Sequence, residues 1–264
     1  MKRKKVIALI TAALTFTMTV CGSLTAAAAS ELTAESKPAT QYTIDANQEV
    51  YALLDFEDTA EFENATKGQI ASPDTLDIYD ENGKLVWSQT VYAFLDQDAP
   101  DTANPSLWRD TQLNHIYGLF EVTDGIYQVR GYDMSNVTFI KGDTGWIVVD
   151  PLMSVECAQA ALALVEENLG TFPVKAVIYS HSHVDHFGGV KGIVSEEEVQ
   201  AGNVQVIAPE GFEKHAVSEN IYAGTAMGRR ASYQYGTMLE GGETGSLAIG
   251  IGMGQSKGRT SYIS

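Results

Sequence analysis

The chain has 264 residues, of which 44% are hydrophobic and 19% are charged, and its formal net charge is −17. This length and composition are typical of a globular protein with one large domain, or with a domain and a sizeable extension, and they exclude bulk disorder. The acidic balance disfavours nucleic acid and anionic membranes as partners, because both would repel such a surface.

Residues 1–29 are expected to be a signal peptide that directs export. Residues 2–5 are all basic, the run VIALITAALTFTMTV is apolar, and LTAAAAS then offers small residues for cleavage near Ala27 to Ala29. A retained membrane anchor and a lipoprotein modified at Cys21 are the two alternatives. Beyond this segment no stretch of eighteen apolar residues predicts a membrane-spanning helix.

Residues 30–48 are polar and are expected to form a flexible leader, followed by an N-terminal extension over 49–118. Within the extension the pattern predicts a helix over 49–68, a β-hairpin over 75–92 and a loop over 98–114. The hairpin prediction rests on Asn82-Gly83, which tolerate positive φ, between two alternating runs. No residue spacing in the extension indicates chemistry.

The pattern changes to that of a layered domain, expected over 119–264. Three short β-branched and aromatic runs, LFEVTDGIYQVRG, NVTFIKGD and GWIVVDP, predict a strand meander. A helix over 154–169, the buried strand VKAVIYS, a second helix capped by Ser195 and Glu198, the strand NVQVIAP and a long helix follow in that order. This alternation predicts an α/β fold. Cys157 lies in an alanine-rich helical pattern and is expected to be a buried structural thiol.

Three of the five histidines stand within six residues, in the stretch SHSHVDHFGGV (180–190). Side chains two apart in an extended backbone point the same way, so His181 and His183 can converge on one metal ion. The turn that follows lets Asp185 and His186 face a second position nearby. Imidazole and carboxylate groups suit zinc, and a thiolate-free site usually keeps a position open for water, which favours a hydrolytic site over a structural one.

The pattern H-x-H-x-D-H resembles the metal-binding signature of the metallo-β-lactamase superfamily. Asp150, at the end of GWIVVD, matches the aspartate with which that fold braces its metal loop. The segments PSLWR (105–109), GLFEVTDGIYQVRGYDMSN (118–136) and AGTAMGRRASYQYG (223–236) further resemble the alkyl sulfatase branch, over roughly residues 50–255. The resemblance implies an αββα sandwich, of which this chain holds the first half, preceded by an α+β extension.

The resemblance also implies zinc-dependent hydrolysis of alkyl sulfate esters, such as dodecyl sulfate, to an alcohol and sulfate. His181 and His183 would bind one Zn²⁺, and Asp185 and His186 a second. The remaining ligands and the general-acid histidine of the family would follow Ser264, so the chain is expected to be a fragment, and the homodimer to form only at full length. Another hydrolase of the superfamily, either a lactonase or a phosphodiesterase, and an inactive truncated product are the alternatives.

Three further features are weaker candidates for the site. His215 lies in an amphipathic helical pattern, which favours a surface or capping role over metal ligation. Arg229 and Arg230 could bind the sulfate group as paired donors, although pairing on the helix surface accounts for them equally well. The stretch GIGMGQSKG (250–258) could cradle an anion through backbone N–H groups, with a flexible loop as the alternative.

Overall fold

The computed structural model describes residues 37–239, 241–243 and 245–263. The chain divides into a unit of Met1–Pro38, of which only the last two residues are described, and a unit of Ala39–Ser264, to which all the elements below belong. The predicted signal peptide and Cys21 therefore lie outside the described residues. Within the described ranges, no helix is both long enough and apolar enough to cross a membrane.

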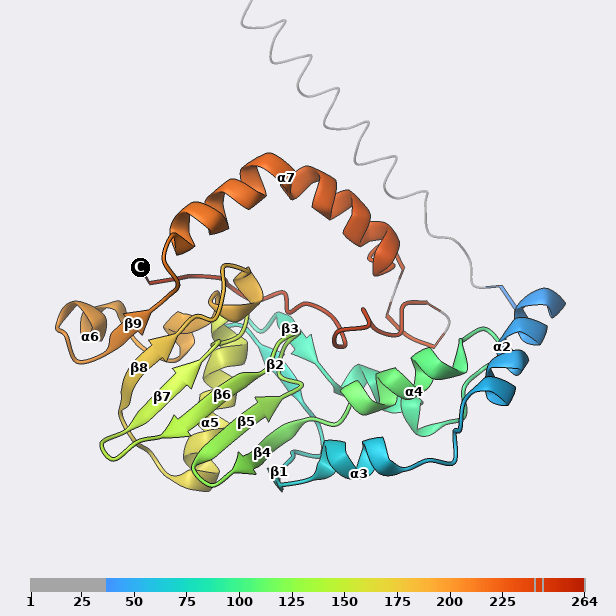
Figure 1. Ribbon diagram of the computed structural model, residues 1–264, viewed down its shortest axis with the longest axis horizontal. Helices are drawn as coiled ribbons and strands as arrows, with labels where there is room; N and C mark the ends of the chain where they lie inside the picture. Colours follow the sequence, from blue (N-terminus) through green and yellow to red (C-terminus); the bar gives the residue numbers. More distant parts are fainter. Residues whose placement is uncertain (1–36, 240, 244, 264) are drawn as a thin grey trace, which may run out of the picture. The chain divides into compact units, whose positions relative to one another are not determined.

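A seven-stranded mixed sheet forms the framework of the larger unit (Figure 1). In spatial order its strands are β1 (Gln69–Ala71), β4 (Gly118–Thr123), β5 (Ile126–Arg130), β6 (Val137–Lys141), β7 (Trp146–Val149), β8 (Val174–Ile178) and β9 (Gln205–Ile207). Neighbours from β1 to β7 are antiparallel, whereas β7, β8 and β9 run parallel. Parallel neighbours need crossover connections, which contain α5 (Val155–Leu169) and α6 (Glu196–Gln200).

The meander contains four strands rather than the three that the sequence predicts. Asp124-Gly125 turns the first run back on itself, with Gly125 at a φ of +75°, and creates the β4–β5 hairpin. The two crossover helices agree with prediction. At the start of α6 the Ser195 side chain accepts from the backbone N–H of Glu198, whose carboxylate accepts in return from the backbone of Ser195. The α/β fold class is confirmed.

The N-terminal extension differs most from prediction. Two helices, α2 (Gln41–Leu53) and α3 (Ala60–Thr66), stand where one was predicted over 49–68, and α2 begins within the segment expected to be a leader. The loop predicted over 98–114 is wrong for its second half, which is helix α4 (Pro105–Asn114). The Asn104 side chain caps this helix, and Pro105 fills its first turn, where a missing N–H costs nothing.

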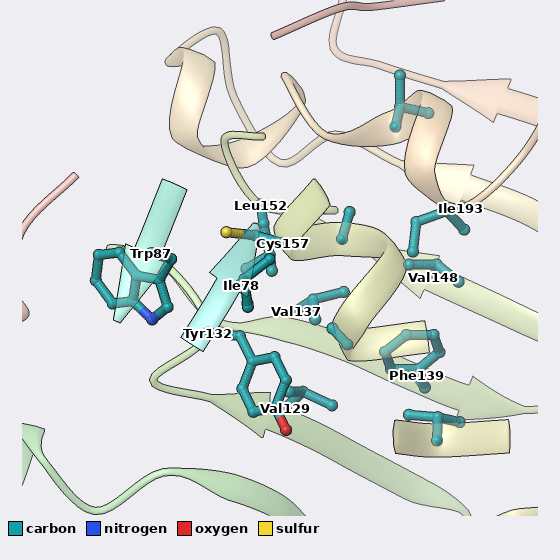
Figure 2. Packing of buried hydrophobic residues seen from close by; sticks show 14 of the residues in the cluster. Ile78, Trp87, Val129, Tyr132, Val137, Phe139, Val148, Leu152, Cys157 and Ile193 are labelled. Carbon is teal, nitrogen blue, oxygen red and sulfur yellow. The ribbon is translucent and has the colours of Figure 1, made fainter. Parts of the chain in front are cut away.

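The predicted hairpin is confirmed as β2 (Asp77–Tyr79) and β3 (Leu85–Ser88), with Gly83 at a φ of +77° in the turn. A 3₁₀ segment, η1 (Thr90–Asp96), follows it. The hairpin, α5 and the large sheet share one buried cluster, in which Figure 2 shows Trp87 and Ile78 beside Cys157 of α5 and Val129 of the sheet. Cys157 is buried as predicted, and this burial raises the pKa of its thiol.

The C-terminal part of the unit consists of helix α7 (Phe212–Gln234) and a mainly irregular segment after it. This segment returns along the hairpin and β8. The backbone N–H of Lys257 donates to the carbonyl of Val86 at 2.8 Å, and the hydroxyl of Tyr179 donates to the carbonyl of Ile263 at 3.1 Å. The segment that includes the glycine-rich stretch is thus fixed to the core at both of these points.

Candidate metal centre

The histidine-rich loop leaves the carboxyl end of β8, beside the carboxyl end of β7. The backbone N–H of Asp150 donates to the carbonyl of Ile178 at 3.0 Å, which extends the pairing of the two parallel strands by one step. The loop then forms two short 3₁₀ turns, η2 (Val184–His186) and η3 (Val190–Gly192). A Cβ atom on Gly189 would lie 2.2 Å from the carbonyl oxygen of Pro151, so only glycine permits this close approach.

All four predicted metal ligands lie in one cluster. The ring centroid of His181 is 4.8 Å from that of His183 and 4.1 Å from that of His186, and His186 Nε2 is 3.0 Å from Asp185 Oδ2. Within the described part of the chain, however, no three His, Cys, Asp or Glu side chains are arranged so that they could hold an ion. The donor types fit zinc, but the pairing of Asp185 with His186 occupies two atoms that a metal would need.

Asp150 braces the cluster, as the resemblance implies. Its carboxylate accepts from the backbone N–H of Ser180 at 2.8 Å and from the Ser180 hydroxyl at 2.6 Å, and it lies 2.9 Å from His186 Nδ1. Asp150 and Leu152 have φ values of +56° and +60°, a left-handed conformation that costs a non-glycine residue about 1–3 kcal/mol. The bonds to the loop hold the carboxylate in place despite this cost.

The two carboxylates control the charge of His186. Burial alone would lower its pKa, but the hydrogen bonds and negative charges of Asp150 and Asp185 outweigh burial and raise the pKa to about 9. For Asp150 and Asp185, burial opposes ionisation, yet their bonds to His186 keep the pKa of each carboxyl below its usual value. The metal-free cluster therefore favours a protonated His186 at neutral pH, and a metal ion would have to displace the proton on Nε2.

Asp133 carries a buried carboxylate that holds the segment just after the Asp150 turn. It is 3% exposed and accepts hydrogen bonds from the backbone of Met134, Met153 and Ser154 and from both the backbone and the hydroxyl of Ser256. Two residues later, the hydroxyl of Ser135 donates to the carbonyl of Asp185 inside the metal loop. The β5–β6 connection thus ties the ligand loop, the Asp150 turn and the C-terminal segment together. No sequence pattern pointed to this role.

Helix α7 contacts the cluster at His183. Glu219 Oε2 lies 3.4 Å from His183 Nε2, a contact that sequence reasoning also missed. His215 is exposed in the first turn of the helix. Arg229 and Arg230 are also exposed and follow Glu219 by about three helical turns, which corresponds to about 15 Å along the helix axis. Their role in sulfate binding stays a prediction.

The chain is similar to curated sulfatases and to a solved alkylsulfatase structure. Residues 130–253 match the Metallo-beta-lactamase superfamily. Over 230 residues the chain is 50% identical to a linear primary-alkylsulfatase from Pseudomonas sp, which covers 86% of this chain and 34% of that protein. The structure of this chain matches that of the stereoselective inverting sec-alkylsulfatase Pisa1 from Pseudomonas sp with a TM-score of 0.81 and 48% identity. The match covers 87% of this chain and 36% of that one. The chain belongs to the alkylsulfatase branch of the metallo-β-lactamase superfamily.

Membership of the alkylsulfatase branch confirms the predicted family and fold. The chain is also similar to a yeast protein, the alkyl/aryl-sulfatase BDS1 of Saccharomyces cerevisiae. The two are 48% identical over 222 residues, which cover 84% of this chain and 34% of that protein. This alkylsulfatase-branch chain spans about a third of the length of the curated relatives that it matches. The superfamily match includes the ligand loop, Asp150 and Glu219.

Proposed function

We propose that the protein is a metal-dependent sulfuric ester hydrolase that acts on alkyl sulfates such as dodecyl sulfate. The proposal rests on the ligand cluster at the end of β8, found in a chain that is 50% identical to a linear primary-alkylsulfatase. His181, His183, Asp185 and His186 would hold zinc, with two ions in the complete site. Zinc, when bound, supplies the Lewis acidity that activates water and neutralises charge on the sulfate group.

The chain's own residues prepare the ligands for that ion. Asp150 accepts a hydrogen bond from Nδ1 of His186, so Nε2 is the nitrogen of that ring that would bind the metal. The Ser180 hydroxyl lies 2.9 Å from Nδ1 of His181, so Nε2 is the nitrogen of that ring left for the metal. Bonds from Asp150 and Ser135 to the loop fix the backbone that carries the ligands. The strained turn at Asp150 and the glycine contacts of the loop would therefore hold the ligands in position before a metal ion binds.

Sulfate release tests the proposal directly. The protein, expressed from its complete reading frame and loaded with zinc, should release sulfate from dodecyl sulfate, measured by ion chromatography. A nitrophenyl phosphate and a lactone serve as competing substrates. Turnover of either of these without sulfate release would contradict the proposal and favour another activity of the superfamily.

Two histidine variants separate a metal role from a general one. His183→Ala should lose zinc and sulfate release while circular dichroism stays unchanged, because the side chain is about half-exposed. His215→Ala removes an exposed imidazole from helix α7 and should keep both zinc and activity. Equal losses in the two variants would contradict the assignment of the ligands.

A further inference from the structure

Each imidazole of the cluster has one ring nitrogen beside a group outside the predicted ligand set. For His181 and His186 this nitrogen is Nδ1, which lies 2.9 Å from the Ser180 hydroxyl and 2.9 Å from the Asp150 carboxylate, respectively. For His183 it is Nε2, which faces Glu219. A metal-binding imidazole uses one nitrogen for the ion and donates the N–H of the other to an outer partner, so the engaged nitrogen identifies the free one.

We propose that Glu219 is a positioning residue for the metal centre. Its carboxylate accepts the Nε2 proton of His183 and thereby presents Nδ1 of that ring to the metal, the opposite of the arrangement at His181 and His186. The inference rests on the proposed function, because it requires a metal ion in the cluster. It goes beyond that function because it assigns a role to helix α7, which lies outside the ligand loop.

The docking of α7 directs Glu219 toward the cluster. Phe212 begins the helix and packs against Phe187, at the end of the ligand loop, and against Tyr179, with ring centroids 5.0 Å and 5.3 Å away. Glu219 is seven residues after Phe212, which is two helical turns, so both side chains project from the same face. The aromatic contact that anchors the helix therefore also places the carboxylate beside His183 of the loop.

The separation between the two groups needs only a small adjustment. The distance of 3.4 Å from Nε2 to Oε2 exceeds by a few tenths of an ångström the usual length of a charge-assisted hydrogen bond, about 2.7–2.9 Å. The side chains of His183 and Glu219 are 54% and 36% exposed, so no tight packing opposes the rotation that closes the gap. The resulting hydrogen bond would also fix the orientation of the His183 ring, and with it the direction of Nδ1, as metal binding requires.

Zinc affinity of the protein expressed from its complete reading frame tests the inference without relying on activity. Glu219→Met keeps the length of the side chain and removes the acceptor, so zinc should bind about 10–100-fold more weakly, measured by competition with a chromophoric chelator. Glu219→Gln keeps one acceptor oxygen and should restore part of the loss. Glu213→Met removes an exposed acid from the first turn of the same helix and should change the affinity less than twofold.

Nitrogen NMR of the zinc-loaded, ¹⁵N-histidine-labelled protein gives a second readout that a purely structural role would not affect. We expect His183 to carry its proton on Nε2 and zinc on Nδ1. Zinc on Nε2 of His183, or unchanged zinc affinity in Glu219→Met, would overturn the inference while leaving the proposed function intact. A wild-type protein that takes up no zinc would overturn both.

Discussion

The carboxylate of Asp133 is expected to contribute strongly to stability. Four donors from other segments converge on it: the backbone N–H groups of Met153, Ser154 and Ser256, and the hydroxyl of Ser256. An unsatisfied buried donor costs about 1–3 kcal/mol, and the costs within one network are not additive. Because water can enter the space left by the side chain, we expect Asp133→Ala to lower the free energy of unfolding by about 3–5 kcal/mol.

Asp133→Asn provides the more discriminating variant. Asparagine has nearly the same shape, but both carboxylate oxygens accept from N–H groups, so its NH₂ group must face a donor in either orientation. We expect a loss of at least about 2 kcal/mol, which a purely steric role would not produce. Exposed Asp143 offers the matched control, since Asp143→Asn should change stability by less than about 0.5 kcal/mol.

Urea unfolding followed by circular dichroism measures these losses, and zinc content reports their effect on the ligand loop. Because Ser135 in the same connection bonds to Asp185, the Asp133 variants should also bind zinc more weakly. A loss below about 1 kcal/mol for Asp133→Ala would refute the reasoning, because it would show that the four donors find other partners.

Three other outcomes are expected. In chelator-treated protein the pKa of His186 is raised from 6.5 to about 9 by Asp150 and Asp185, so this pairing stabilises the fold fully below pH 6.5 and the stabilisation is lost as the pH rises through 9. The difference in urea midpoint between wild type and His186→Gln should therefore shrink over this range, and a constant difference would contradict the pairing. Gly189→Ala places a Cβ atom against the Pro151 carbonyl and should lower both the melting temperature and zinc content, whereas Gly228→Ala, on an open helix face, should not. We also propose export with cleavage near Ala29, so Edman sequencing of exported protein should begin near Ser30; an intact Met1 would count against it.

The sequence predicts elements best where one local rule decides. The capping box at Ser195 and the Asn82-Gly83 turn are such cases, and the structure contains both. Helix α4 was missed because asparagine followed by proline begins loops and helices alike, and burial of Trp108 settles the outcome. That burial depends on tertiary packing, which a local pattern does not contain.

The same contrast holds at the candidate site. The four predicted ligands lie within six residues of sequence, 181–186, so their proximity was evident from spacing alone. Glu219 reaches His183 from a helix 36 positions later, and Asp133 depends on Ser256, 123 positions away. Neither residue stands in a motif, and only the docking of α7 and the return of the C-terminal segment reveal them. The residues that support the cluster were therefore beyond prediction, whereas the proximity of the four predicted ligands was not.

The separation of Asp133 from Ser256 also affects how the protein is made. Ribosomes add about 5–20 residues per second, so the 123 residues between the two partners take roughly 6–25 s to translate. The β4–β7 meander can pair early, because each of its strands follows its neighbour in the chain. During that interval the nascent chain already contains the predicted metal ligands, but the hydrogen bonds between Asp133 and Ser256 cannot yet form. Slow translation between residues 190 and 256 would prolong this stage, in which premature metal capture or proteolysis can compete with folding.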